Sequence, residues 1–336
     1  MLNLHNAIAI FICFFMCPTT KTCEKPLTWA EAVTMRNQTF GTTRNEADFS
    51  ASCAAFAPDN SILAFGSDEG AIRIFNPELG LINSYSHNKQ YTDPIVALAF
   101  LGEKHFVSAM LNQGIQIWDL AQQNFPTISI NKKIFSCIAN SSNTVTAGQE
   151  EGVVSLHDIR QKQSIRLGKH ASEAKTLASL ENGQVVAAGD CSGIISIWDT
   201  RKREEAIAST ESHYPAFVNA IATKNRQLIS ADSSQRIFVW NYINNFLQKK
   251  YELKLEKTNS AIKSIAFVPD NSGYLCTTRD GKTFFIDKET HAATEIIQSQ
   301  PQKPLQTYSS HALSFSSDAK HLAIAHGAMH HIIKRK

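Results

Sequence analysis

The sequence lacks the short motifs on which many enzyme classes depend. It contains no GxSxG, no P-loop, no GxGxxG and no HExxH. These absences speak against serine hydrolases, nucleotide- and dinucleotide-binding enzymes and zinc proteases. An excess of charge of one sign is also missing, because 33 Lys and Arg stand against 30 Asp and Glu in 336 residues. The formal net charge of +3 gives no reason to expect nucleic acid or an anionic membrane as a partner.

Cysteine and histidine are present, but not in metal-binding arrangements. No CxxC and no Cys/His zinc spacing occurs among the seven cysteines, which are Cys13, Cys17, Cys23, Cys53, Cys137, Cys191 and Cys276. Those beyond the N-terminal region lie in apolar segments and are predicted to be small buried thiols. A C-terminal group of histidines comprises His321, His326, His330 and His331. Neighbouring strand residues point to opposite faces, so we predict polar strand positions there, with no metal and no cofactor.

What the sequence does contain is a repeat. Seven short apolar segments share a small residue in the fourth place and recur every 39 to 48 residues. They are SCAAF (52–56), VALAF (96–100), SCIAN (136–140), KTLAS (175–179), NAIAT (219–223), KSIAF (263–267) and HALSF (311–315). The small residues are Ala55, Ala99, Ala139, Ala178, Ala222, Ala266 and Ser314. Such regular spacing predicts seven copies of one structural unit.

Two further strands follow each segment. The second strand of the fourth unit is VVAAG (185–189), and the third is IISIWD (194–199). Turns such as QEEG and DCSG separate second from third strands, where Gly supplies the positive φ of a tight hairpin. Each unit is therefore a small antiparallel meander, which cannot bury its own faces. Seven meanders stacked radially can, and slim residues in the innermost strands fit the crowding near the axis.

These units resemble those of the WD-repeat β-propeller family over about residues 50 to 336. The marks are IWD at 117–119 and 197–199, and FxPD at 56–59 and 267–270. The resemblance implies an all-β, seven-bladed β-propeller of four-stranded antiparallel blades, closed by a strand from the N-terminus. The last repeat ends in its third strand near 330–334, and the candidate for the closing strand lies within Val33 to Thr43.

In the family, a turn Asp, a His, a Ser or Thr and a Trp form a hydrogen-bonded tetrad. The histidines near the family position are His87, His170, His213 and His311. The residues at the turn position are Glu69, Asn112, Glu151, Ser192, Ser234 and Asp280. Only Asp280 matches, and Ile286 takes the place of its Trp. We therefore expect mostly broken tetrads and blades that rely on apolar packing.

The N-terminus carries an uninterrupted apolar run from Ala7 to Cys17. Eleven residues are too few for a membrane span but suit the centre of a signal peptide. The n-region has no Lys or Arg, and no AxA site follows. We expect residues 1–23 to be a signal peptide or a short hydrophobic anchor and residues 24–336 to be the propeller. The alternative is an apolar tail packed on the propeller. A working leader would place the protein in the periplasm, outside the cell or at a membrane; otherwise it would be cytoplasmic.

One face of the predicted ring collects basic residues. In WD-repeat folds, the loops after third strands and those between first and second strands share a face. In units three to five these loops carry Arg160, Lys162, Arg201, Lys202, Arg203, Lys224 and Arg226. The alternatives are an ordinary solvated rim and a docking face for an acidic protein segment or phosphate. In the docking interpretation the arginines supply specificity, because they bind anions in a bidentate way.

The leading functional hypothesis is a non-catalytic scaffold that binds a protein or peptide partner on a propeller rim. One alternative is a hydrolase-like propeller enzyme with an active site in the axial funnel. Another is a substrate receptor of a cullin-RING ubiquitin ligase, because Trp198 to Arg201 resembles a WDxR element. Nucleic-acid binding is not expected at near-neutral charge.

Overall fold

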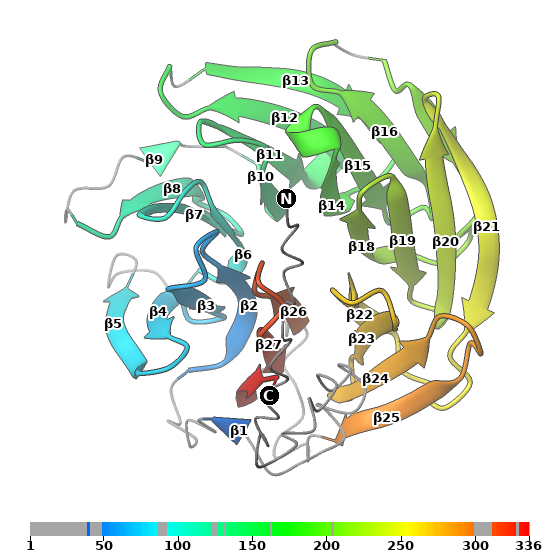
Figure 1. Ribbon diagram of the computed structural model, residues 1–336. Coiled ribbons are helices and arrows are strands. Elements are labelled where there is room, and N and C mark those ends of the chain that lie inside the picture. Colours follow the sequence, from blue (N-terminus) through cyan, green and yellow to red (C-terminus); the bar gives the residue numbers. More distant parts are fainter. Residues whose placement is uncertain are drawn as a thin grey trace, which may run out of the picture.

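The computed structural model describes 39–40, 49–86, 93–121, 127–128, 130, 132–161, 163–202, 205–298, 311–326 and 329–335. These residues form seven four-stranded antiparallel sheets arranged as blades around a ring (Figure 1). The chain is therefore a seven-bladed β-propeller, as the repeat predicts. Residues 1–23, with the predicted leader, lie outside the described residues.

The first strand of each blade lies nearest the centre of the ring. The innermost strands are β2 (Ala51–Phe56), β6 (Ile95–Phe100), β10 (Ile134–Ala139), β14 (Ala174–Leu180), β18 (Val218–Lys224), β22 (Ile262–Phe267) and β26 (His311–Phe315). The second strands are β3 (Leu63–Ser67), β7 (His105–Met110), β11 (Thr144–Gln149), β15 (Val185–Asp190), β19 (Gln227–Asp232), β23 (Gly273–Thr278) and β27 (His321–His326).

Two more strands complete each blade outward. The third strands are β4 (Ala71–Asn76), β8 (Gly114–Asp119), β12 (Val153–Asp158), β16 (Ile195–Asp199), β20 (Arg236–Ile243), β24 (Lys282–Asp287) and β28 (Met329–Lys334). The outer strands are β5 (Gly80–Ser86), β9 (Thr127–Ile128), β13 (Gln163–Lys169), β17 (Ala208–Thr210), β21 (Phe246–Lys254), β25 (Ala293–Gln298) and β1 (Thr39–Phe40). Two single-turn 3-10 helices, η1 (Glu150–Gly152) and η2 (Glu181–Gly183), lie in the turns.

The ring closes through its N-terminal strand. Thr39 pairs with Ile333 and Phe40 with Ile332, so β1 is the outer strand of the seventh blade. This strand lies inside the predicted range of 33–43. Closure pairs both ends of the described chain and removes the free edge of an open ring.

The core lies between neighbouring blades. One apolar cluster joins Leu180 and Ile197 of blade 4 to Val218 and Trp240 of blade 5. The small-residue column of the repeat is confirmed in register except in blade 3, where Ile138 and not Ala139 takes that level. The sequence alone permits two alignments of the blade 3 segment that differ by one residue, and the strand pairing distinguishes them.

The four described cysteines of the ring are free thiols, and three of them are buried. Burial raises the pKa of Cys53 to about 12, which fits the predicted inert packing role. Within the described part of the chain, no helix has the length and apolar character needed to cross a bilayer.

Candidate functional site

The two faces of the ring differ in the loops that they carry. The upper face carries the turns between second and third strands and the loops that enter the innermost strands. The lower face carries the turns between first and second strands and between third and fourth strands. Five of the seven predicted basic residues are described, and they lie on the lower face, in blades 3 to 5. Lys162 and Arg203 fall outside the described residues.

Most described cations of that lower rim already have partners. Arg160 lies 3.7 Å from Asp158, and Arg226 lies 3.5 Å from Glu181. Arg201 donates from Nε and Nη2 to the two oxygens of Asp199, at 2.9 and 2.8 Å. These bonds hold the pKa of Asp199 at about 2.

The remaining two lysines of the rim differ in what they contact. Lys224 donates to the carbonyls of Val268 and Pro269 in blade 6, at 3.2 and 2.6 Å. Lys202 is exposed. With all three described arginines facing carboxylates, this rim offers less unpaired charge than the sequence implies. That it binds a partner stays a prediction.

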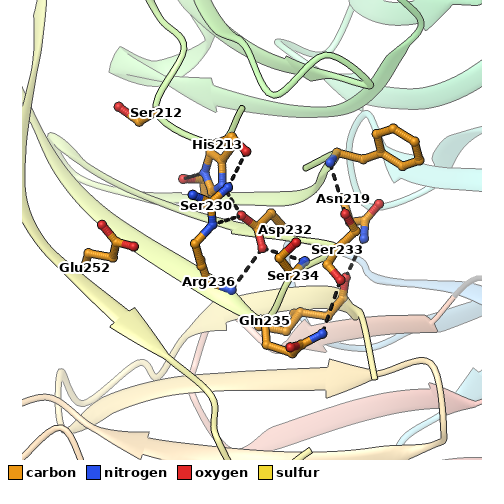
Figure 2. Close-up of polar contacts among 12 residues, drawn as sticks. Ser212, His213, Asn219, Ser230, Asp232, Ser233, Ser234, Gln235, Arg236 and Glu252 are labelled. Atoms are coloured by element: carbon orange, nitrogen blue, oxygen red, sulfur yellow. Dashed lines mark hydrogen bonds and ion pairs between the residues drawn. The ribbon is translucent and has the colours of Figure 1, made fainter. Parts of the chain in front are cut away.

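A complete hydrogen-bonded tetrad lies inside blade 5, and Figure 2 shows three of its members, His213, Ser230 and Asp232. His213 Nδ1 is 2.9 Å from Asp232 Oδ2, and its Nε2 is 2.7 Å from Ser230 Oγ. Trp240 Nε1 donates to the same Ser230 oxygen at 2.9 Å. Arg236 Nε donates to Asp232 at 2.8 Å and covers the group from outside. The expectation that Asp280 alone matches the family pattern is therefore wrong.

Electrostatics explain why the blade 5 tetrad is stable although it is buried. Burial lowers the pKa of His213, so the imidazole is neutral near neutral pH. Burial acts to raise the pKa of Asp232, but hydrogen bonds from His213 and the Arg236 backbone outweigh it, and the pKa is lowered. Asp232 is thus a buried carboxylate surrounded by donors. It lies two residues before Ser234, the residue at the turn position of the sequence repeat.

Blade 4 holds a tetrad with one member missing. His170 Nδ1 lies 3.3 Å from Asp190 Oδ2, and its ring packs edge-on against Trp198. Ala188 stands where blade 5 has Ser230, two residues before the aspartate. His170 Nε2 is buried and has no hydrogen-bond partner among the described residues.

Restoring that serine is expected to stabilise the protein. Ala188→Ser should raise the free energy of unfolding by about 1 kcal/mol, because a hydroxyl then reaches His170 Nε2. Denaturant unfolding measures the change. Ala187→Ser on the same buried strand is the matched control. It should lower stability, because its hydroxyl is buried without a partner there. Equal effects at both positions would contradict the missing-serine account.

The remaining blades depart further from the pattern. In blade 2, Trp118 Nε1 donates to Ser108 at 2.8 Å. In blade 3, Gln149 replaces the aspartate and His157 the tryptophan, and Ser155 bridges them at 2.5 and 2.7 Å. His87 and the side chain of His311 lie outside the described residues. Blade 5 thus keeps the family motif, and three different arrangements replace it in blades 2, 3 and 4, which agrees with the expected divergence.

His157 makes the stability of blade 3 depend on pH. Burial lowers its pKa from 6.5 to about 4, so the unfolded chain binds more protons between these values. Its stabilising contribution is complete above pH 6.5 and is lost as the pH falls. We expect it to remove about 2 kcal/mol of stability between pH 7 and pH 5. Unfolding at both pH values, compared with His157→Gln, isolates the effect; identical pH slopes would contradict it.

Of the C-terminal histidines, His321 contacts a neighbouring blade. His321 Nε2 lies 3.2 Å from Glu78 of blade 1, and Lys334 donates to the same carboxylate at 2.5 and 2.7 Å. His330 and His331 lie on β28, as predicted. Among the described residues, no group of three or more His, Cys, Asp or Glu is placed to hold a metal ion.

A second group of cations, which was not predicted from the sequence, lies on the upper face. Lys175 and Lys263 stand near the upper ends of β14 and β22, and Arg279 lies in the turn after β23. Both lysines occupy the first column of the repeat rows KTLAS and KSIAF. Their shared position in the repeat can be read from the sequence. The strand register is needed to show that both lysines stand at the upper ends of their strands.

Comparisons with known proteins agree with the fold. A family model described as "WD domain, G-beta repeat" matches residues 41–76, and one described as "Nucleolar protein 10-like, N-terminal domain" matches residues 127–293. "Periodic tryptophan protein 2" of Arabidopsis thaliana is 21% identical over 211 residues, covering 61% of this chain and 23% of that protein. "U3 small nucleolar RNA-associated protein 15 homolog" of Gallus gallus is 19% identical over 266 residues, covering 76% of this chain and 49% of its own length.

A third relative is "Mitotic checkpoint protein BUB3.3" of Arabidopsis thaliana, 26% identical over 161 residues, or 48% of this chain and 49% of that protein. The chain thus spans half or less of the length of these relatives. The expectation of export is wrong, because the matched descriptions name nucleolar proteins and point to the nucleus instead. An apolar run of eleven residues is too general a signal to fix a compartment.

The ring of seven four-stranded blades, the family tetrad in blade 5 and the matched repeat models lead to one assignment. This chain is a divergent member of the WD-repeat β-propeller family.

Proposed function

We propose that the chain is a non-catalytic scaffold that binds a protein or peptide partner. The observation that carries the proposal is the distribution of its side chains. The His–Asp pairs of blades 4 and 5 are sealed inside the blades, whereas large aromatic side chains are exposed on loops of the ring. Tyr214 is 69% and Phe217 is 50% exposed on the upper face. Exposed aromatics are enriched at sites of protein binding.

The runner-up is an enzyme, and one constellation favours it at first sight. Ser230, His213 and Asp232 have the mutual spacing of a catalytic triad. All three residues are 0% exposed, and Ser230 Oγ also accepts from Trp240. A nucleophile needs a free lone pair and room for substrate beside it. The burial of this serine therefore supports a structural role within the blade.

The place of action we propose is a nucleolar assembly. Support comes from the nucleolar descriptions of the matched family model and of a relative that covers 76% of this chain. Repeat propellers suit such assemblies, because a closed ring presents several rigid surfaces to different partners at once.

Sedimentation of nuclear extract tests this function. The tagged chain is expected to sediment with large complexes and to keep bound proteins after RNase treatment. Purified protein is expected to show no turnover on ester, peptide and phosphoester substrates. Sedimentation only as a free 37 kDa protein would overturn the scaffold proposal. Turnover abolished by Ser230→Ala, in a variant that still folds, would favour the enzyme.

A further inference from the structure

The innermost strands share a bulge at their upper ends. In six blades the pairing register shifts by one residue there, which leaves one residue outside the ladder. These bulge residues are Ser52, Val96, Phe135, Lys175, Asn219 and Lys263. All stand at the same level of the ring, so together they form a layer at the upper ends of the innermost strands, called the upper mouth of the ring.

Side chains of this layer reach from one blade to the next. Ser52 Oγ donates to the carbonyl of Ile95, and Asn219 Nδ2 donates to the equivalent carbonyl of Ile262 at 2.9 Å. Lys175 Nζ lies 3.8 Å from the ring centroid of Phe135 in the preceding blade. The layer therefore follows the inner circumference of the ring and places its polar groups around the upper mouth.

Three cations gather at this mouth over blades 4 to 6. Lys175 has an acidic neighbour, Glu173, at 3.5 Å. Lys263 is half-buried, and Arg279 is exposed in the adjoining turn. Among the described residues, neither Lys263 nor Arg279 has an acidic partner within ion-pair distance. Burial, together with the positive charges of Arg279 and Lys175, lowers the pKa of Lys263.

An unpaired, half-buried cation is a source of binding energy. Lys263 has lost part of its hydration and gains nothing in return from the described residues. An anion placed between Lys263 and Arg279 would restore that loss through charge-assisted hydrogen bonds. Because the two groups belong to rigid strands and a tight turn of one blade, little ordering is required when the anion binds.

The surrounding charges favour an anionic group on a peptide over a nucleic acid. Elsewhere on the upper face, lysines of the loop before β10 are already paired: Lys133 lies 3.4 Å from Glu150, and Lys132 contacts Glu151. A nucleic-acid strand needs a track of many unpaired cations. One or two carboxylates of a peptide, in contrast, can be bound by the three cations of the mouth alone.

Apolar contacts for such a peptide are available beside the mouth. Tyr214 and Phe217 lie in the loop that enters β18 of blade 5, between the blades that carry Lys175 and Lys263. The Phe217 end of the loop is fixed, because Phe217 N donates to Ser233 Oγ at 3.1 Å (Figure 2). Aromatic side chains on a fixed loop are suited to contact residues that flank an acidic anchor.

We propose that the cation group of the upper mouth, Lys175, Lys263 and Arg279, binds a carboxylate side chain of an acidic peptide segment. The inference rests on the proposed scaffold function and names the partner's chemistry. It places the anion site on the opposite face from the arginines that the sequence singles out.

Fluorescence anisotropy with defined probes tests the site. The probe is a labelled Gly-Leu-Glu-Asp-Glu-Phe-Gly peptide, and its matched control carries Gln-Asn-Gln at the centre. We expect the acidic probe to bind about tenfold more tightly than the amide control, and less tightly as salt rises. Lys263→Gln with Arg279→Gln should abolish that difference. Arg160→Gln with Arg201→Gln removes the same charge from the lower rim and should preserve it.

Folding controls keep the result interpretable. Lys263→Gln should keep or raise the midpoint of thermal unfolding, because it removes an unpaired half-buried charge. Arg279→Gln alone, in an exposed turn, is the second variant and should weaken the acidic probe severalfold. Three results would overturn the proposal: loss of binding only in the lower-rim variant, tighter binding of a ten-nucleotide oligouridylate than of the acidic probe, or no preference for the acidic probe over its amide control. Sedimentation in complexes would leave the scaffold function standing in each of these cases.

Discussion

Replacing Asp232 with Ala is expected to lower the free energy of unfolding by about 3–5 kcal/mol. The carboxylate is completely buried and accepts from His213, from Arg236 Nε and from the backbone N–H groups of Ser234 and Arg236. Alanine would leave these donors without an acceptor in a site that water does not reach. Each unpaired buried group costs about 1–3 kcal/mol, so the effect should be among the largest of any single substitution.

Equilibrium denaturation measures the Asp232→Ala effect, and Asp280→Ala is its control. Asp280 is the aspartate that the sequence pattern selects, but it is partly exposed. Its carboxylate accepts from Thr278 and Thr258 and lies 4.0 Å from Lys282. We expect it to cost about 1 kcal/mol. A larger loss for Asp280→Ala than for Asp232→Ala would show that the tetrad does not stabilise blade 5 as described.

Replacing Gly183 with Ala is expected to cost about 2–4 kcal/mol, through backbone strain and a clash between blades. Gly183 has a φ of +87°, and an added Cβ would lie 2.0 Å from the carbonyl oxygen of Asn140 in blade 3. Asn140 in turn donates to the Gly183 carbonyl at 3.4 Å. The substitution should therefore separate blades 3 and 4 on the lower face.

Two other glycines separate the causes of the Gly183 effect. Gly80 has a φ of +92° with open space around its Cβ position, so Gly80→Ala should cost only the backbone term, about 1 kcal/mol. Gly102 has open space and no positive φ, and Gly102→Ala should be nearly neutral. Thermal unfolding of all three ranks them. A Gly183 variant no less stable than the Gly80 variant would exclude close contact between the blades.

The ring itself could be predicted from sequence because it depends on repetition. Small residues in seven rows, Gly in the turns and a closing segment within 33–43 define the blades without any long-range contact being known. Blade 5 shows where this reasoning stops. Its turn has no glycine, and Gln235 adopts the positive φ of 63° instead. Turn identity in that blade is therefore set by backbone geometry and not by a residue type.

The polar sites could be predicted less well, for two physical reasons. The tetrad depends on which side chains of different strands meet. When its acidic position is placed two residues too late in the sequence, Ser234 is selected in place of the buried Asp232. The upper mouth depends on bulges, which place Lys175 and Lys263 outside the strand ladder. Charge counting along the chain finds Arg160 and Arg201 but does not show that Asp158 and Asp199 pair with them.

Photo-crosslinking tests most directly whether a partner binds the upper face. A benzophenone side chain can replace Phe217 on the upper face or Phe246 on the lower face, and these residues are 50% and 70% exposed. Both changes keep an aromatic ring, so they differ mainly in the face they report. After irradiation in cells, we predict a protein adduct from position 217 and none from position 246. Adducts from position 246 alone, or none from position 217, would contradict the account.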